Sequence, residues 1–166
     1  MTNKTSFDFN TAFSRNIGWL TRSEQQDLRT KRVAIAGMGG VGGIHLLTHT
    51  RLGISNFNIA DFDHFDLHNF NRQAGANMNS IGEPKVAVMR EMAKQINPES
   101  DIRVFDQGAT DENLDDFLDG VDIYVDALDY FAKYVRRKVF ARCEQLGIPA
   151  ITAAPIGMGA GLLAFL

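Results

Sequence analysis

Short apolar runs alternate along the chain with longer segments whose apolar residues recur every three or four positions. The run at residues 31–37 is almost continuously apolar and ends in glycines, which is typical of a strand buried on both faces of a parallel sheet. Similar runs predict further strands at 57–61, 102–105, 121–126, 148–153 and 162–166.

The intervening segments have helical spacing and recognisable helix ends. Gly53 and Gly147 follow two of them in the position that stops a helix, and Pro84 suits the first turn of another. We expect helices at about 41–52, 84–96, 110–118 and 132–146, with Thr110 capping the third, and one before the first strand that Thr21 and Glu24 begin as a capping box. This alternation predicts an α/β fold: a Rossmann-like, doubly wound, mostly parallel sheet with helices on both faces.

The length of 166 residues, 45% of them hydrophobic, is enough for one sizeable core. We expect residues 1–30 to form an N-terminal helical leader and residues 31–166 to form one nucleotide-binding domain. The last apolar strand would stand at an edge with nothing after it, so we expect the natural domain to continue beyond residue 166 or another chain to cover this edge.

Charge and composition exclude several classes of partner. The formal net charge is -3, and no run of like charge resembles a DNA-binding stripe. No apolar run is long enough for a membrane span, and the first ten residues lack the layout of a signal peptide, so we expect a soluble cytoplasmic protein. The single cysteine, Cys143, provides neither a disulfide framework nor a pair of zinc-binding thiolates.

A glycine-rich loop lies between the first strand and the following helix. Gly37, Gly39 and Gly42 have the spacing G-x-G-x-x-G, which lets backbone N–H groups approach a phosphate at the positive end of a helix. Asp61 ends the next strand, about twenty residues further on, where a carboxylate accepts hydrogen bonds from ribose hydroxyls. Together they predict an adenosine nucleotide, but they do not separate NAD from ATP.

A second group of polar residues favours ATP. Attack on an α-phosphate places negative charge on oxygen atoms, which calls for fixed cations and for a magnesium ion held by a carboxylate. Arg72 and Lys85 supply cations, and Asp129 supplies an oxygen ligand at the carboxyl end of its strand. We expect all three to converge on one triphosphate.

With these motifs, the chain from Arg15 onward resembles the ThiF/MoeB/HesA proteins and the adenylation domains of ubiquitin-like-protein activating enzymes. The resemblance implies that Arg15 reaches ATP across the interface of a homodimer, that Asp61 binds ribose and that Asp129 binds magnesium. It also implies a nucleotide site made of Gly37, Gly39, Gly40, Gly42, Asp61, Asn69, Arg72, Gln73, Lys85 and Asp129, with Arg15, Asn69, Arg72, Lys85 and Asp129 as its catalytic residues.

In that family, the C-terminal carboxylate of a ubiquitin-like or sulfur-carrier protein attacks ATP and gives an acyl-adenylate and pyrophosphate. A carboxylate is already ionised at neutral pH, so the reaction needs no general base. Many members also carry two C-x-x-C zinc pairs and a later acyl-accepting cysteine, and this sequence has neither.

Several alternatives stay open. The stretch from Asn69 to Gln73 also resembles the family branch that acts on threonylcarbamoyladenosine in tRNA, for which Arg136, Arg137 and Lys138 would provide a basic surface, or else only a solvated helix face. The glycine loop and Asp61 alone would suit an NAD-dependent oxidoreductase, and the apolar end would suit a noncatalytic subunit of a heterodimer.

Individual residues also have plainer explanations. His45 and His49 are spaced for a metal on one helix face but lack a third ligand. Arg72 could form a surface salt bridge, and Asp129 could cap the last helix. Cys143 lies on an apolar stripe and is expected to pack as a small hydrophobe.

Overall fold

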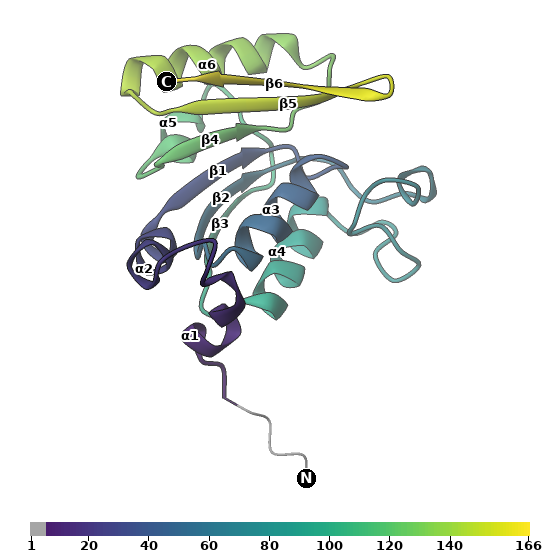
Figure 1. Ribbon diagram of the computed structural model, residues 1–166. Helices are drawn as coiled ribbons and strands as arrows, with labels where there is room; N and C mark the ends of the chain where they lie inside the picture. Colours follow the sequence, from purple (N-terminus) through teal and green to yellow (C-terminus); the bar gives the residue numbers. More distant parts are fainter. Residues whose placement is uncertain (1–5) are drawn as a thin grey trace.

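The computed structural model describes residues 6–166; the first five residues of the predicted leader lie outside the described residues. Six strands form one sheet in the order β3-β2-β1-β4-β5-β6 (Figure 1). The first five run parallel to their neighbours, and β6 pairs antiparallel with β5. The strands are β1 (Arg32–Ala36), β2 (Asn56–Ala60), β3 (Asp101–Phe105), β4 (Ile123–Asp126), β5 (Ala150–Ile156) and β6 (Gly159–Phe165).

Helices cover both faces of this sheet, which confirms the predicted doubly wound fold. Side chains of α3 (Gly42–Arg51) and α4 (Lys85–Ile96) pack on one face, where Ile35 and Leu46 are fully buried. Side chains of α5 (Leu114–Leu118) and α6 (Lys133–Leu146) pack on the other face with Ala34 and Val139. Because successive residues of a strand point to opposite faces, both of which are covered here, β1 is apolar and buried from Val33 to Ala36.

The helix ends follow the local sequence. The Thr21 hydroxyl and the Glu24 carboxylate form the predicted capping box at the start of α2 (Arg22–Thr30). Gly53 and Gly147, with φ of 92° and 67°, end α3 and α6 in the left-handed region that glycine adopts without a steric penalty.

Three elements differ clearly from the predicted bounds. Helix α5 begins at Leu114, and Thr110 does not cap it, because the Asn113 side chain accepts from the Thr110 N–H and donates to the Gly108 carbonyl, holding a turn before the helix. The last two strands form a longer hairpin than expected: β5 continues to Ile156, beyond residue 153, and β6 begins at Gly159, before residue 162.

The leader packs on the far end of α3. It contains α1 (Phe9–Ala12), the 3₁₀ turn η1 (Ser14–Asn16) and α2. The side-chain amides of Asn16 and Gln25 donate to the carbonyls of Arg51 and Leu52, at 3.1 and 2.7 Å. The leader is therefore attached where α3 ends, at the opposite end from the glycine loop.

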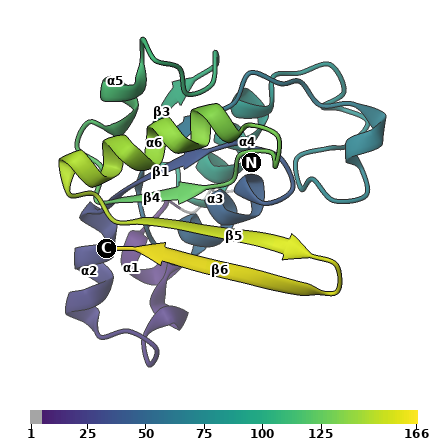
Figure 2. The same cartoon turned by 90° about the horizontal axis from the view of Figure 1, so that it is seen from above.

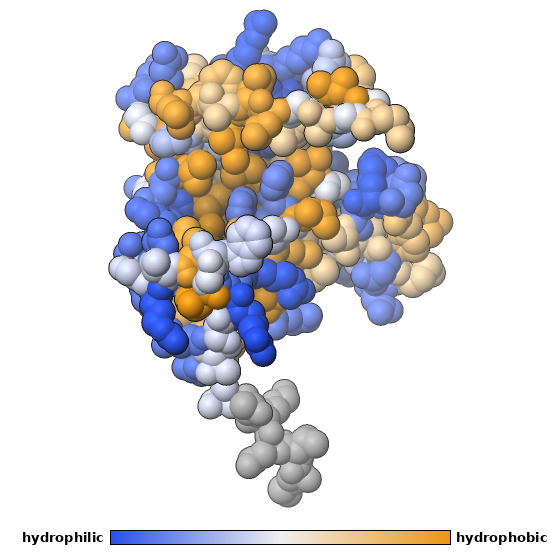
Figure 3. Space-filling view, viewed as in Figure 1, coloured by the Kyte–Doolittle hydropathy of each residue, from blue (hydrophilic) through white to orange (hydrophobic). Residues whose placement is uncertain are grey.

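The hairpin of β5 and β6 is the most exposed part of the sheet. It lies at one side of the molecule, and hydrophobic residues gather over it on the face shown in Figure 3. Leu162, Leu163 and Phe165 keep 70, 60 and 50% of their surface exposed. None of the helices described between residues 6 and 166 is long and apolar enough to cross a membrane.

Candidate functional site

The glycine loop connects β1 to the amino end of α3, and close backbone contacts explain two of its glycines. A Cβ atom on Gly37, whose φ is 94°, would lie 2.3 Å from the Ala127 carbonyl oxygen. A Cβ atom on Gly42 would lie 1.7 Å from the Gly37 carbonyl oxygen. Gly39 and Gly40 have more room, since only atoms of Gln73 and Arg72 would lie within 4 Å of a Cβ atom there. The loop thus forms a tight turn at the amino end of α3, where backbone N–H groups can bind an anion.

Asp61, directly after β2, is tied to this loop. Its Oδ2 accepts from the Met38 N–H at 2.6 Å, and its Oδ1 accepts from the Asp63 N–H at 2.8 Å. The carboxylate therefore lies beside the glycine loop at the carboxyl edge of the sheet, where ligands bind in open α/β folds.

The segment between β2 and α4 projects to one side of the molecule, beside helices α3 and α4 (Figures 1 and 2). It contains the short 3₁₀ turn η2 (Leu67–Asn69), which Asp66 and Asn69 close reciprocally as a capping box. Asn69 is buried, and its carbonyl accepts from the N–H groups of Arg72 and Gln73 at 3.2 and 2.9 Å. Asn69 therefore supports the turn that carries these two side chains.

That turn brings Arg72 and Gln73 against the glycine loop. A Cβ atom on Gly40 would lie 3.3 Å from the Arg72 carbonyl, and one on Gly39 would lie 3.6 Å from the Gln73 amide nitrogen. Gln73 is buried, and its amide oxygen makes no hydrogen bond within residues 6–166. The Arg72 guanidinium donates to the His68 carbonyl and to Asn71 and forms no ion pair among the described residues, so the salt-bridge alternative finds no support.

Lys85 begins α4 and is buried in the same region. Its Nζ lies 3.0 Å from Oδ2 of Asp63, the residue whose N–H binds Asp61. The Lys85 side chain is 7% exposed, whereas that of Asp63 is 54% exposed. The ion pair therefore holds a desolvated cation next to Asp63, which lies two residues from Asp61 along the chain.

Asp126, the last residue of β4, and Asp129, in the segment that follows, have different environments. Asp126 is 1% exposed and accepts from Arg136, Thr152 and Tyr124. Asp129 is exposed, and its Oδ1 accepts from the Phe131 N–H at 3.0 Å. The amino cap of α6 is Ala132, so Asp129 does not cap that helix.

Arg15 is the one predicted site residue that the structure places elsewhere. It lies in η1, next to Asn16, which binds the last residue of α3. Ten residues of helix separate this point from Gly42, a length of about 15 Å. Within one chain, Arg15 is therefore on the opposite end of α3 from the glycine loop.

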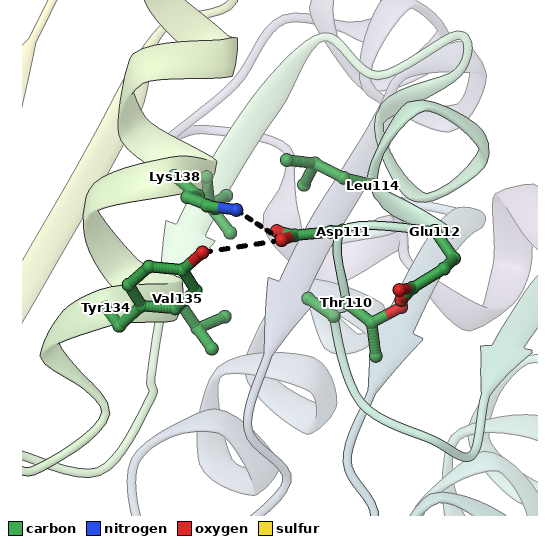
Figure 4. A pocket seen from close by; sticks show the side chains of 9 residues that line it. Thr110, Asp111, Glu112, Leu114, Tyr134, Val135 and Lys138 are labelled. Atoms are coloured by element: carbon green, nitrogen blue, oxygen red, sulfur yellow. Dashed lines mark hydrogen bonds and ion pairs between the residues drawn. The ribbon is translucent and has the colours of Figure 1, made fainter.

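The three neighbouring cations Arg136, Arg137 and Lys138 of α6 do not form one basic surface. Arg136 points inward to Asp126, and Lys138 pairs with Asp111, toward which Tyr134 also points (Figure 4). Of the three, only Arg137 is exposed without an ion pair to another of residues 6–166. The solvated helix face is the better description, with two of its charges neutralised.

The side chains of His45, His49 and Cys143 are not arranged for metal binding or for nucleophilic chemistry. His45 and His49 stack with ring centroids 5.8 Å apart, and no group of three His, Cys, Asp or Glu side chains within residues 6–166 is arranged to hold a metal. Burial raises the pKa of the Cys143 thiol to about 11, so the thiol stays protonated and inert at neutral pH.

Three residues that shape this region were not predicted from the sequence: Asp63, Asp126 as a structural anchor, and Arg136 as its partner. Asp63 is two residues after Asp61, and Asp126 is three before Asp129. The presence of two acidic residues near the end of each strand was the sequence feature that could have pointed to Asp63 and Asp126. Which acid of each pair faces inward depends on the tertiary contacts.

Comparison with known proteins places this geometry in a family. Residues 13–166 match the family model described as "ThiF family". The chain is 31% identical over 142 residues to the tRNA threonylcarbamoyladenosine dehydratase of Bacillus subtilis (strain 168), covering 85% of this chain and 55% of that protein. It is 32% identical over 139 residues to the sulfur carrier protein ThiS adenylyltransferase of Escherichia coli (strain K12), covering 84% and 55%.

A solved structure agrees with these matches. The E. coli tRNA N6-threonylcarbamoyladenosine dehydratase, TcdA, in complex with ATP, superposes with a TM-score of 0.81 at 28% identity, covering 86% of this chain and 58% of that one. The chain thus spans little more than half the length of the proteins it matches.

Proposed function

The chain belongs to the ThiF family, and we propose that it forms the ATP-binding part of an enzyme that activates a carboxylate by transferring AMP to it. One observation carries the proposal: segments far apart in the sequence bring Asp61, Arg72, Gln73 and Ala127 into contact with the glycine loop at the carboxyl edge of the sheet. The buried Lys85 pairs with Asp63, whose N–H binds Asp61. A dinucleotide site needs only the loop and Asp61.

The residues present fit ATP and magnesium. The loop is a cradle in which Gly37 and Gly42 leave no space for a side chain, and the buried Gln73 amide beside it retains an unused polar atom. Asp129 offers a carboxylate oxygen without a partner among the described residues. A single carboxylate is sufficient for Mg²⁺, which completes its coordination with phosphate oxygens and water.

The proposed reaction is a displacement at phosphorus. An oxygen of the carboxylate forms a bond to the α-phosphorus, the bond to the bridging oxygen breaks, and pyrophosphate leaves with the electron pair. Arg72 and Lys85 would stabilise the charge on the phosphate oxygens, while Asn69 and Gln73 position and contact the nucleotide. Magnesium, held by Asp129, would neutralise the leaving pyrophosphate.

For the substrate, we propose the C-terminus of a ubiquitin-like or sulfur-carrier protein, since one relative is a sulfur carrier protein adenylyltransferase. A threonylcarbamoyladenosine side chain in tRNA is the second candidate, supported by the matches to the B. subtilis and E. coli dehydratases. We also propose a homodimer in the cytoplasm, in which Arg15 of one protomer reaches the nucleotide of the other, because Arg15 is too distant within one chain.

Calorimetry of Mg-ATP binding tests the site. We expect Asp129→Ala and Arg72→Ala each to weaken binding at least about tenfold, because each removes a charged contact to phosphate or metal. Arg103→Ala and Asp119→Ala are matched controls, because this exposed ion pair lies at β3 and just after α5. Binding of NAD but not ATP, or Mg-ATP binding that both site variants leave intact, would refute the proposal.

Exchange of labelled pyrophosphate into ATP separates the substrates. Exchange that depends on a carrier protein ending in a free carboxylate supports the first candidate, and exchange that depends on threonylcarbamoyladenosine-containing tRNA supports the second. ATP binding without exchange in either case would favour the noncatalytic-subunit alternative.

A further inference from the structure

Arg136 connects three points of the segment that follows β4. Its Nε donates to Oδ2 of Asp126 at 2.7 Å, and its Nη2 donates to the carbonyls of Leu128 and Asp129 at 2.6 and 3.2 Å. A guanidinium can do this because its donors lie in one rigid plane, whereas a lysine ammonium is a single point. Arg136 thus links α6 to both ends of the Asp126–Asp129 segment.

The Asp126 end of this link is itself firmly held. The carboxylate accepts from the Thr152 hydroxyl of β5 at 2.8 Å and from the Tyr124 hydroxyl of β4 at 3.2 Å. Asp126 is 1% exposed, and the Arg136 side chain is 26% exposed. Two strands and one helix therefore fix the position of the guanidinium.

The middle of the segment, at Ala127, lies against the glycine loop, two residues before Asp129. The Ala127 N–H donates to the Ala36 carbonyl at 3.0 Å, and the Ala127 carbonyl occupies the space where a Gly37 side chain would be. The Asp129 side chain, by contrast, is exposed and has one hydrogen bond, to the N–H of Phe131. The Asp129 carbonyl accepts from Arg136 and, at 3.0 Å, from the N–H of Ala132. Backbone contacts, those from Arg136 among them, therefore determine the position of the Asp129 carboxylate.

We infer that Arg136 is a positioning residue of the nucleotide site: it holds the Asp129 backbone beside the glycine loop and does not itself contact ATP. The inference rests on the proposed role of Asp129 as the magnesium ligand. Residues that orient a metal ligand from behind change metal affinity by roughly tenfold to a hundredfold when replaced.

Arg136→Lys is the informative variant. It keeps a positive charge next to the buried Asp126 carboxylate, so the chain is expected to fold, but one ammonium cannot serve all three acceptors. Arg142→Lys is the matched control, because Arg142 is on the same helix and its Nε binds the exposed Asp115 at 2.7 Å.

Two measurements test the positioning role. Calorimetry is expected to show Mg-ATP binding weakened roughly tenfold in Arg136→Lys, with AMP binding in the absence of metal unchanged. In an Asp129→Ala background, Arg136→Lys should not weaken Mg-ATP binding further. If Arg136 acts only through Asp129, its effect disappears once the Asp129 carboxylate has been removed. Equal losses for Mg-ATP and AMP, or a full effect that persists without Asp129, would overturn the inference.

Hydrogen exchange provides a readout that requires no nucleotide. The amides of residues 127–131 should exchange faster in Arg136→Lys than in the wild type, whereas Arg142→Lys should leave them unchanged. Unchanged exchange in Arg136→Lys would overturn the inference. If Asp129→Ala and Arg72→Ala both leave Mg-ATP binding intact, the proposed function fails instead, and the exchange experiment still decides whether Arg136 holds the segment.

Discussion

Two regions border the candidate site, and they are stabilised in different ways. The glycine loop and the Asp126–Asp129 segment meet through backbone atoms, so that a single methyl group at Gly37 or Gly42 would collide with a carbonyl. The segment between β2 and α4 is stabilised mainly by side-chain contacts, such as the capping box of Asp66 and Asn69 and the ion pair of Lys85 with Asp63.

The difference indicates how each region would tolerate change. A close backbone contact leaves room for almost no residue except glycine. A larger side chain there would force the backbone segments apart and disrupt the whole contact. Side-chain contacts are individually modest, typically about 1 kcal/mol, and can be removed one at a time. The first region should therefore respond to substitution by losing stability, and the second chiefly by losing affinity or local order.

The largest effect should come from Gly42→Ala. A Cβ atom there lies 1.7 Å from the Gly37 carbonyl oxygen and 2.9 Å from Cβ of Ala127, so β1 and α3 would have to separate. We expect a loss of at least about 3 kcal/mol in the free energy of unfolding, measured by urea denaturation.

Gly39→Ala is the control for this substitution, since its Cβ atom would meet the Gln73 amide at an ordinary 3.6 Å. It should change stability by less than about 1 kcal/mol. Equal losses in both variants would show that close packing does not distinguish the two glycines.

Lys85→Met should lower the affinity for Mg-ATP with little change in the stability of the fold. Its partner Asp63 is half-exposed and stays hydrated when the cation is removed, and methionine still fills the buried space. We expect Mg-ATP affinity to fall at least about tenfold and the free energy of unfolding to change by less than about 1 kcal/mol.

Lys94→Met, near the other end of α4, is the control for this effect and should alter neither quantity. A large loss of stability in Lys85→Met would instead place Lys85 among the residues on which the fold depends.

Asn69→Ala should loosen the second region locally. The substitution removes the hydrogen bond from the Asp66 N–H to Oδ1 of Asn69, which measures 2.9 Å. We expect a loss of about 1 kcal/mol in stability and faster hydrogen exchange at residues 66–73, with α3 unaffected. Asn79→Ala, at an exposed asparagine of the same segment, should leave both unchanged.

The smallest effect concerns pH and the helix after the glycine loop. Burial, and then the neighbouring His45, lower the pKa of His49 below its ordinary value of 6.5. The folded chain therefore binds fewer protons than the unfolded chain in mild acid, so stability is lost as pH falls below 6.5. His49→Gln should reduce this loss in urea denaturation at about pH 7.5 and about pH 5.5, whereas His68→Gln, at an exposed residue of the second region, should not.

Much of the fold was predictable because its rules are local. The apolar runs of β1 and β4, the capping box at Thr21 and the glycines after α3 and α6 act within a few residues, and the structure confirms each. The start of α5 was not predictable in the same way, because an alternative turn around Asn113 competes with the helix.

The layered fold and the glycine loop could be predicted from the sequence, because strand periodicity and the need for glycine at a tight turn follow from the chain's own geometry. The tertiary structure was needed to show that Asp126 is buried, that Lys85 pairs with Asp63, that Arg136 binds the Asp129 carbonyl, and that Arg15 lies at the far end of α3. These contacts join residues that are not neighbours in the sequence, and sequence separation does not give the distance between two residues in space. The contacts form only when the sheet brings its strand ends together.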